Sequence, residues 1–190
     1  IAVTQFTAWG FEPGLCDAKN HPAFEQAIQD ALATSKTLGS EYLCVVAGNL
    51  QPGHTLEAMH QNAIDGLKRV APLAEAAGVT LMLEPMNGRV DHPGHCLYGS
   101  ADALKIVRAV ASPRVKILWD LYHMQISEGD LCGHLREGFA EIAYLQIADH
   151  PGRHEPGTGE IHYPRVLREA HELGFRGWVG LECSPKGDPL

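Results

Sequence analysis

The chain has 190 residues, of which 45% are hydrophobic, so it can bury a sizeable core as one domain, which excludes intrinsic disorder. Its 15 basic and 23 acidic residues give a net charge of −8, which disfavours nucleic acid or an anionic membrane surface as the main partner. No membrane-length apolar run, signal-peptide pattern or Cys-x-x-Cys pair occurs, and the five cysteines are scattered, so we expect a cytoplasmic protein without a disulfide framework, thiolate zinc site or membrane partner.

Strand and helix patterns alternate along the chain without a linker or a low-complexity segment. The apolar runs predict strands at residues 1–6, 42–47, 79–83, 115–119, 142–145 and 178–181. Helical spacing predicts helices at residues 22–38, 55–77, 100–111, 131–139 and 163–173, with Ser100 as an N-cap and with Gly39, Gly78 and Gly174 as stops.

Six strands joined by helices are all parallel if each helix is a crossover, which is the pattern of an α/β fold. A closed eight-stranded barrel takes about 250 residues. We therefore predict an incomplete TIM-type (β/α) barrel of about six parallel strands that lacks the first two β/α units and the last helix. Residues 1–190 are then a single domain and a fragment of a larger barrel, with exposed sheet edges at residues 1–6 and 178–183. The alternative is a naturally open six-stranded sheet.

Polar residues stand where four of these strands end. Glu84, Asp120, Gln146 and Glu182 are 36, 26 and 36 residues apart, about the length of one strand-helix unit. Ligands of parallel sheets bind beyond the carboxyl ends of the strands, so these oxygen donors are expected to converge on a metal ion. The alternative for each residue is a helix cap or an exposed position.

Six segments around the strand ends carry a resemblance to a known family. They are Leu83-Glu84-Pro85-Met86-Asn87, Asp120-Leu121-Tyr122-His123-Met124-Gln125, Gln146-Ile147-Ala148-Asp149, Pro151-Gly152-Arg153, Glu155-Pro156-Gly157-Thr158-Gly159-Glu160-Ile161 and Gly177-Trp178-Val179-Gly180-Leu181-Glu182. These segments resemble the hydroxypyruvate isomerase family within the xylose isomerase-like barrels. The resemblance extends over nearly all of the chain and aligns Ile1 with the third strand of such a barrel. It implies a divalent metal held by Glu84, Asp120, Gln146 and Glu182, with the two glutamates also moving protons.

Two carboxylates on opposite sides of the substrate suffice for an isomerisation of this kind. Converting an α-hydroxy ketone into an α-hydroxy aldehyde requires a proton to leave one carbon and return to its neighbour through an enediol. Glu84 and Glu182 are the catalytic candidates, while Asp120 and Gln146 serve mainly as ligands. All-oxygen coordination suits Mg²⁺ or Mn²⁺.

Three further residues are candidates for substrate binding. His123 follows Asp120 closely, in the loop or first turn after the strand, and can donate a hydrogen bond to a substrate oxygen. Arg153 can bind a substrate carboxylate in a bidentate fork. Asn87, with Asp91, can contact substrate hydroxyls or orient Glu84. The alternatives are a packed or capping histidine, a solvated arginine and a turn-forming asparagine.

Two other loop patterns carry weaker signals. Gly157-Thr158-Gly159 can present backbone amides to an anionic ligand, although loop flexibility explains the glycines equally well. His92 and His95 lack the glutamate of a zinc-protease motif, and we interpret both as loop residues, with one of them near the pocket.

The leading hypothesis is a metal-dependent aldose-ketose isomerase acting on a small hydroxy-oxo acid, either hydroxypyruvate, which gives tartronate semialdehyde, or 2-oxo-tetronate. A sugar 3-epimerase is an alternative, although that class more commonly has His in place of Gln146. An endonuclease IV-like phosphodiesterase using Glu84, Asp120, His123, Glu160, His162 and Glu182 is another, against which the acidic charge stands. A non-catalytic remnant is the third. The expected partner is a small molecule, and a homo-oligomer is left open.

Overall fold

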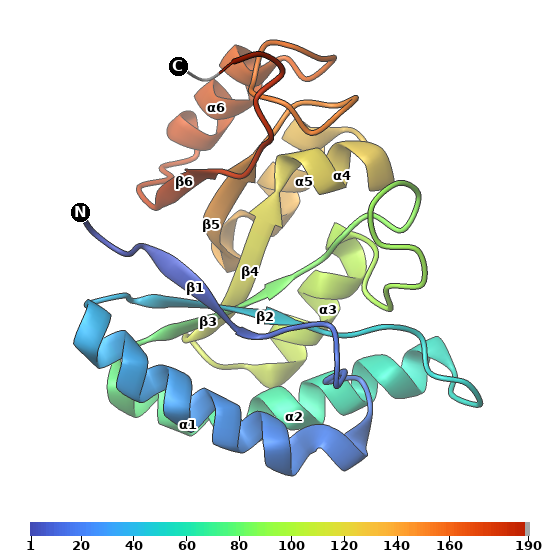
Figure 1. Cartoon of the computed structure of the whole chain (residues 1–190), viewed down its shortest axis with the longest axis vertical. Coiled ribbons are helices and arrows are strands. Elements are labelled where there is room, and N and C mark those ends of the chain that lie inside the picture. The colour runs from blue at the N-terminus through green and yellow to red at the C-terminus, as the bar shows by residue number, and fades with distance from the viewer. Residues whose placement is uncertain (189–190) are drawn as a thin grey trace.

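The sheet is parallel throughout, and its strands are hydrogen-bonded in chain order from β1 to β6 in the computed structural model, which describes residues 1–188. The strands are β1 (Gln5–Trp9), β2 (Tyr42–Val46), β3 (Thr80–Glu84), β4 (Val115–Asp120), β5 (Ile142–Ile147) and β6 (Trp178–Leu181). The sheet curls like part of a barrel, with β1 and β6 at its two edges (Figure 1). This arrangement confirms the incomplete parallel barrel that the strand count predicts.

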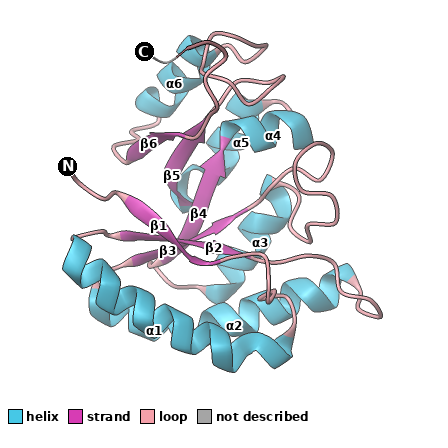
Figure 2. Cartoon of the chain, viewed as in Figure 1, coloured by secondary structure: helices cyan, strands magenta, loops and turns pink. Residues whose placement is uncertain are grey.

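Helices cover the convex face of the curled sheet (Figure 2). They are α1 (His21–Leu38), α2 (Leu56–Ala77), α3 (Ser100–Val110), α4 (Leu121–Ser127), α5 (Leu131–Gly138) and α6 (Tyr163–Glu172), with short 3₁₀ turns η1 (Ala18–Asn20) and η2 (Phe139–Glu141). Gly39 and Gly78 end α1 and α2 in the left-handed conformation, as their positions predict.

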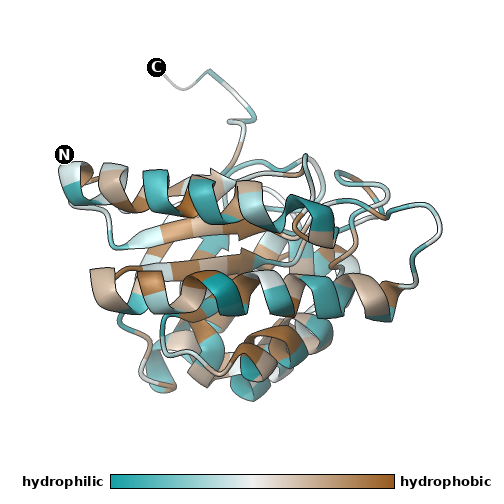
Figure 3. Cartoon of the chain, turned by 90° about the horizontal axis from the view of Figure 1, so that it is seen from below, coloured by the Kyte–Doolittle hydropathy of each residue, from teal (hydrophilic) through white to brown (hydrophobic). Residues whose placement is uncertain are grey.

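Alternate residues of the central strands β2, β3 and β4 pack into two different cores. Odd-numbered residues such as Leu83 pack under the helices, where the strands show as brown bands between helices of mixed hydropathy (Figure 3). On the concave face a smaller cluster contains Cys44, Val46, Met82, Leu118 and Tyr144. Because side chains alternate along a strand, the residues two positions after Met82, Leu118 and Tyr144 also face inward. These residues are Glu84, Asp120 and Gln146.

The first strand lies further along the chain than the sequence predicts. It spans Gln5–Trp9 and not residues 1–6, because Gln5 pairs with Tyr42 at the start of β2. Ile1 is fully exposed, while Phe6 and Ala8 pack against the core. An apolar residue at the start of the chain therefore gave a misleading strand signal.

Helix α4 is absent from the sequence prediction, which left the segment after Asp120 as a loop or first turn. Its first turn is capped by Asp120, whose Oδ1 accepts the backbone N–H of Tyr122 at 2.8 Å. Ser100, expected to be an N-cap, is instead the first residue of α3, and Gly99 is the cap. The Ser100 hydroxyl accepts a hydrogen bond from Trp119 Nε1 at 2.8 Å, so it joins α3 to β4.

The edge strand β6 is exposed, as expected. Trp178 and Leu181 are 51% and 61% exposed, so their apolar side chains lack cover from the rest of the described chain. Across residues 1–188, no helix combines the length and the apolar character needed to span a membrane.

Candidate active site

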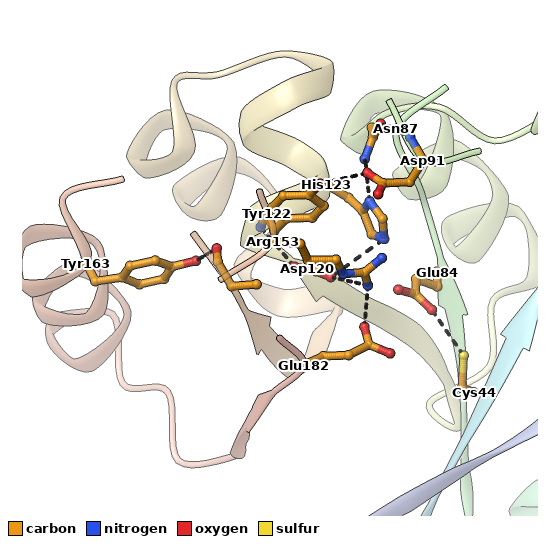
Figure 4. A network of polar contacts seen from close by, with 11 residues as sticks. Cys44, Glu84, Asn87, Asp91, Asp120, Tyr122, His123, Arg153, Tyr163 and Glu182 are labelled. Carbon is orange, nitrogen blue, oxygen red and sulfur yellow. Dashed lines mark hydrogen bonds and ion pairs between the residues drawn. The ribbon is translucent and has the colours of Figure 1, made fainter. Parts of the chain in front are cut away.

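Two carboxylates and one imidazole converge at the carboxyl ends of β3 and β4 (Figure 4). Glu84, Asp120 and His123 each offer an atom that lies within 4.8 Å of those of the other two, and all three residues are buried. Glu84 is the last residue of β3, Asp120 is the last residue of β4, and His123 lies in the first turn of α4. The predicted convergence of Glu84 and Asp120 therefore exists, and the unpredicted helix brings His123 to the same point.

Two buried oxygens beside this cluster lack hydrogen-bond partners. They are Oδ2 of Asp120 and Oε1 of Gln146, and these residues are register partners on β4 and β5. A buried oxygen that accepts no hydrogen bond destabilises the fold, and a bound cation or a hydrogen-bond donor would stabilise it. Their position and chemistry fit a hard divalent cation, which prefers carboxylate and amide oxygens.

Glu182 lies on the other side of the mouth, beyond the end of β6. Its carboxylate is 51% exposed and accepts a hydrogen bond from Arg153 Nη2 at 2.7 Å. The same Nη2 is 3.7 Å from Asp120 Oδ2. A guanidinium thus lies between two of the four expected ligands, while Glu182 stands outside the cluster of Glu84, Asp120 and His123.

Burial, with a smaller contribution from neighbouring negative charges, raises the pKa of both strand-end carboxyl groups. The pKa of Glu84 rises to about 8, first because of burial and then because of the charges of Asp120 and Glu182. Burial also raises the pKa of Asp120 to about 7, although the Arg153 charge opposes this shift. Without a cation, Glu84 is therefore mostly protonated at neutral pH, and Asp120 is partly protonated.

His123 remains neutral at physiological pH. Burial lowers its pKa to about 3, and the charges of Arg153 and His92 act in the same direction. Its Nε2 is 3.7 Å from Asp120 Oδ2, and its Nδ1 is 2.6 Å from the Asn87 amide nitrogen. His123 therefore faces the pocket on one side and Asn87 on the other.

Asn87 is fully buried behind His123, away from the pocket. Its Oδ1 accepts the backbone N–H groups of Val90 and Asp91, which is the turn-forming role that the sequence left open. Arg153 differs from Asn87, because it lines a cavity of ≈ 210 Å³ together with Glu84, His123 and Glu182.

Sequence reasoning missed several residues of this pocket. Cys44 and Phe11 line the cavity, and the Cys44 thiol donates to Glu84 Oε2 at 3.3 Å. Tyr122 lies under the Arg153 guanidinium, with 5.1 Å between its ring centre and Cζ, and its hydroxyl donates to Asp91 at 2.9 Å. The inward-facing position of Cys44 two residues before the end of β2 was a usable signal, whereas the loop residue Phe11 carried none.

His92 and His95 lie in the loop after β3, as predicted. His92 stacks on Phe11, with ring centres 4.8 Å apart, and lines the cavity. His95 packs edge-on against the same phenylalanine from a buried position. One of the two histidines is therefore near the pocket, and the other belongs to the packing behind it.

The glycine loop after β5 does not offer its amides to a ligand, so that expectation is wrong. The buried carboxylate of Asp149 accepts the backbone N–H groups of Gly157 at 2.7 Å and Ile161 at 3.1 Å. The N–H of Thr158 donates to Glu155 O at 3.3 Å. An internal carboxylate thus takes the place of an external anion, and it shapes the loop that carries Arg153.

A curled parallel (β/α) sheet with a pocket at the carboxyl ends of its strands is the architecture of the (β/α)-barrel class of proteins. The sequence model of the family described as xylose isomerase-like TIM barrel matches residues 3–189. The chain belongs to this family.

The chain is also similar to named isomerases. The hydroxypyruvate isomerase of Escherichia coli (strain K12) is 33% identical over 90% of this chain, and the 2-oxo-tetronate isomerase of Cupriavidus necator is 35% identical over 86%. The chain spans 66% and 62% of the lengths of these two relatives. A solved structure from Brucella melitensis, described as an AP endonuclease of family 2, is 28% identical with a TM-score of 0.92, covering 98% of this chain and 74% of that one.

Proposed function

We propose that the chain carries the active site of a metal-dependent isomerase for a small 2-oxo hydroxy acid. The reaction converts hydroxypyruvate into tartronate semialdehyde, or 2-oxo-tetronate into its aldehyde isomer. The observation that carries the proposal is the inward convergence of Glu84 and Asp120, together with buried oxygens of Asp120 and Gln146 that accept no hydrogen bond. The names of the relatives support the choice of reaction and substrates.

Glu84, Asp120, Gln146 and Glu182 would hold a divalent cation such as Mg²⁺ or Mn²⁺, which when bound polarises the substrate carbonyl and stabilises the negative oxygens of the enediolate. The donor set supports this choice, because it consists of three carboxylates and one amide. Gln146 favours a hard cation over zinc, for which an imidazole at this position would be a better ligand.

Glu84 and Glu182 are the proposed proton carriers. Without a cation, burial and then the charges of Asp120 and Glu182 raise the pKa of Glu84 to about 8, so the surroundings of this carboxyl group favour the protonated form that it reaches after accepting a proton. Glu182 lines the same cavity from the segment just after β6 and serves as the second carrier. One glutamate removes the proton from the carbon that bears the hydroxyl, and the other serves the adjacent carbon of the enediol.

Arg153 is the proposed contact for the substrate carboxylate. Its guanidinium lines the cavity, lies over the Tyr122 ring and bonds to Glu182, so it is held in place before substrate arrives. Arg153 also has a positive φ of 55°, a conformation that is uncommon for a residue with a Cβ and that the surrounding loop must stabilise. His123 is proposed to donate a hydrogen bond to a substrate oxygen.

The test is proton exchange in deuterated water. Incubated with hydroxypyruvate and Mn²⁺ or Mg²⁺, the chain is expected to incorporate deuterium at C3 and to form tartronate semialdehyde, while chelation of the metal stops both. A Glu84→Gln variant is the matched control and is expected to show neither. Exchange that continues in the chelated protein, or that is equally fast with a neutral ketose, would contradict the proposal.

A further inference from the structure

The Asn87 side chain makes four hydrogen bonds, which use its full bonding capacity. Oδ1 accepts the backbone N–H groups of Val90 at 3.0 Å and Asp91 at 3.1 Å. Nδ2 bonds to Asp91 Oδ2 at 2.8 Å and to His123 Nδ1 at 2.6 Å. The residue is completely buried, so water does not compete for any of these bonds.

These partners allow only one orientation of the amide. Turning it by 180° would place the NH₂ group against two backbone N–H donors and the carbonyl oxygen against the Asp91 carboxylate. Both changes exchange a hydrogen bond for a repulsive contact in a buried place. The group that faces His123 is therefore the NH₂ donor, and its assignment follows from the chemistry of its neighbours.

We infer that Asn87 is a positioning residue that holds His123 as the tautomer with its proton on Nε2. A donor facing Nδ1 requires a lone pair there, so the single proton of the neutral ring lies on Nε2. The same contact disfavours the imidazolium form, in which a second proton would meet the Asn87 N–H.

This tautomer decides what His123 can do in the pocket. Nε2 faces the site, 3.7 Å from Asp120 Oδ2, and a protonated Nε2 is a donor and not a metal ligand. Of the three residues that converge here, only Glu84 and Asp120 then remain as ligands. This assignment rests on the proposed function. His123 then donates a hydrogen bond to a substrate oxygen, and only oxygen atoms remain as ligands for the cation.

The tautomer can be read directly by two-dimensional ¹H–¹⁵N spectra of the imidazole rings in the wild-type chain. The ring is assigned by comparison with His123→Gln, which removes only the His123 signals. The expected pattern is a protonated Nε2 and an unprotonated Nδ1. A protonated Nδ1 in the wild-type protein overturns the inference, and this readout requires no activity.

An Asn87→Asp substitution tests whether the amide sets the tautomer, and it is made together with Asp91→Asn so that the new carboxylate does not face a second one. A carboxylate facing Nδ1 attracts a proton to that nitrogen, so the ¹⁵N pattern of His123 is expected to change to a protonated Nδ1. The matched control is Asn62→Asp, since the Asn62 amide on α2 bonds to the Cys16 carbonyl at 2.9 Å, outside the pocket. The control is expected to leave the His123 signals unchanged. An unchanged pattern in the double variant would mean that another group sets the tautomer.

Enzyme kinetics test whether the tautomer of His123 affects turnover. The double variant is expected to lower kcat for hydroxypyruvate by about 10-fold or more and to change KM by less than about 3-fold, because the donor acts chiefly as negative charge develops on the substrate oxygen. An equal kcat with an altered tautomer would overturn the assigned role of His123. If the wild-type chain shows the expected tautomer and no isomerisation, the proposed function fails while the tautomer assignment stands.

Discussion

The two sides of the pocket are built differently. On the β3–β4 side, Glu84 and Asp120 are buried at 6% and 0% exposure and extend from the central strands of the sheet. On the β6 side, the carboxylate of Glu182 is half exposed and follows an edge strand, with Arg153 as its partner. The first side is positioned by central strands and the core. The second lies just past an edge strand, where the Glu182 N–H donates to Ile147 O at 3.1 Å and the Glu182 carboxylate pairs with Arg153.

The two sides of the pocket therefore differ in how easily their carboxyl groups ionise and in how firmly they are held. The buried side is preorganised, but its carboxylates repel each other and resist ionisation, as the raised pKa values of Glu84 and Asp120 show. On the exposed side the Glu182 carboxylate contacts water and the Arg153 guanidinium, and its geometry is less constrained. A cation that binds both sides would neutralise the first and order the second.

The largest expected effect is on turnover. Glu84→Gln and Glu182→Gln should each lower kcat by about 10³-fold, because each removes a proton carrier while preserving the shape of the side chain. The measurement is the isomerisation rate at saturating metal and hydroxypyruvate. A near-normal rate for either variant would show that only the other side of the pocket moves protons.

Arg153→Ala should affect binding more than chemistry. We expect KM for acid substrates to rise by about 10²-fold with a smaller change in kcat, since a bidentate contact to the substrate carboxylate is lost. Arg69→Ala is the control, because Arg69 pairs with Glu25 on the outer surface. An equal loss on neutral sugars would argue against carboxylate recognition.

The two glutamates should also differ in their effect on stability. The folded-state pKa of Glu84, about 8, exceeds the value of about 4.3 in an unfolded chain, so its ionisation destabilises the metal-free fold increasingly as the pH rises between these values. In the presence of EDTA at pH 8, Glu84→Gln should therefore raise the free energy of unfolding by about 2 kcal/mol.

Glu182→Gln is the matched comparison, since its carboxylate is half exposed and little stability depends on its desolvation. The measurement is urea denaturation at pH 5 and pH 8. An equal gain for both variants at pH 8, or a gain for Glu84→Gln that does not shrink at pH 5, would remove the distinction between the two sides.

The smallest expected effect concerns the loop that carries Arg153. Burial alone would raise the pKa of Asp149, but hydrogen bonds from the backbone N–H groups of Ile161, Gly159, Gly157 and His150 lower it overall. The carboxylate therefore stabilises the fold above its unfolded pKa of about 3.9, and this contribution is lost as the pH falls through the lower folded value.

Asp149→Asn should cost about 1 kcal/mol at pH 7, and the difference from wild type should vanish in strong acid. Thermal unfolding at pH 7 and below pH 3 measures this. A pH-independent difference would assign the effect to packing instead of charge.

The sequence alone predicted the parallel barrel segment and the places of Glu84, Asp120 and Gln146. Both follow from local rules: apolar runs of strand length, helical spacing between them, and a polar residue at the carboxyl end of each run. It failed for the first strand and for α4. Ile1 is apolar without a pairing partner, and a seven-residue helix starting directly after a strand leaves little periodicity to detect.

Only the tertiary structure decided how the pocket residues share their bonds. Three hydrogen bonds in the pocket join residues far apart in the sequence. Asn87 and His123 are 36 positions apart, Arg153 and Glu182 are 29 apart, and Cys44 and Glu84 are 40 apart. These contacts form where loops and strand ends of different β/α units meet. Local patterns encode each unit, but the curl of the sheet and the packing of the helices determine which side chains lie within hydrogen-bond distance of one another.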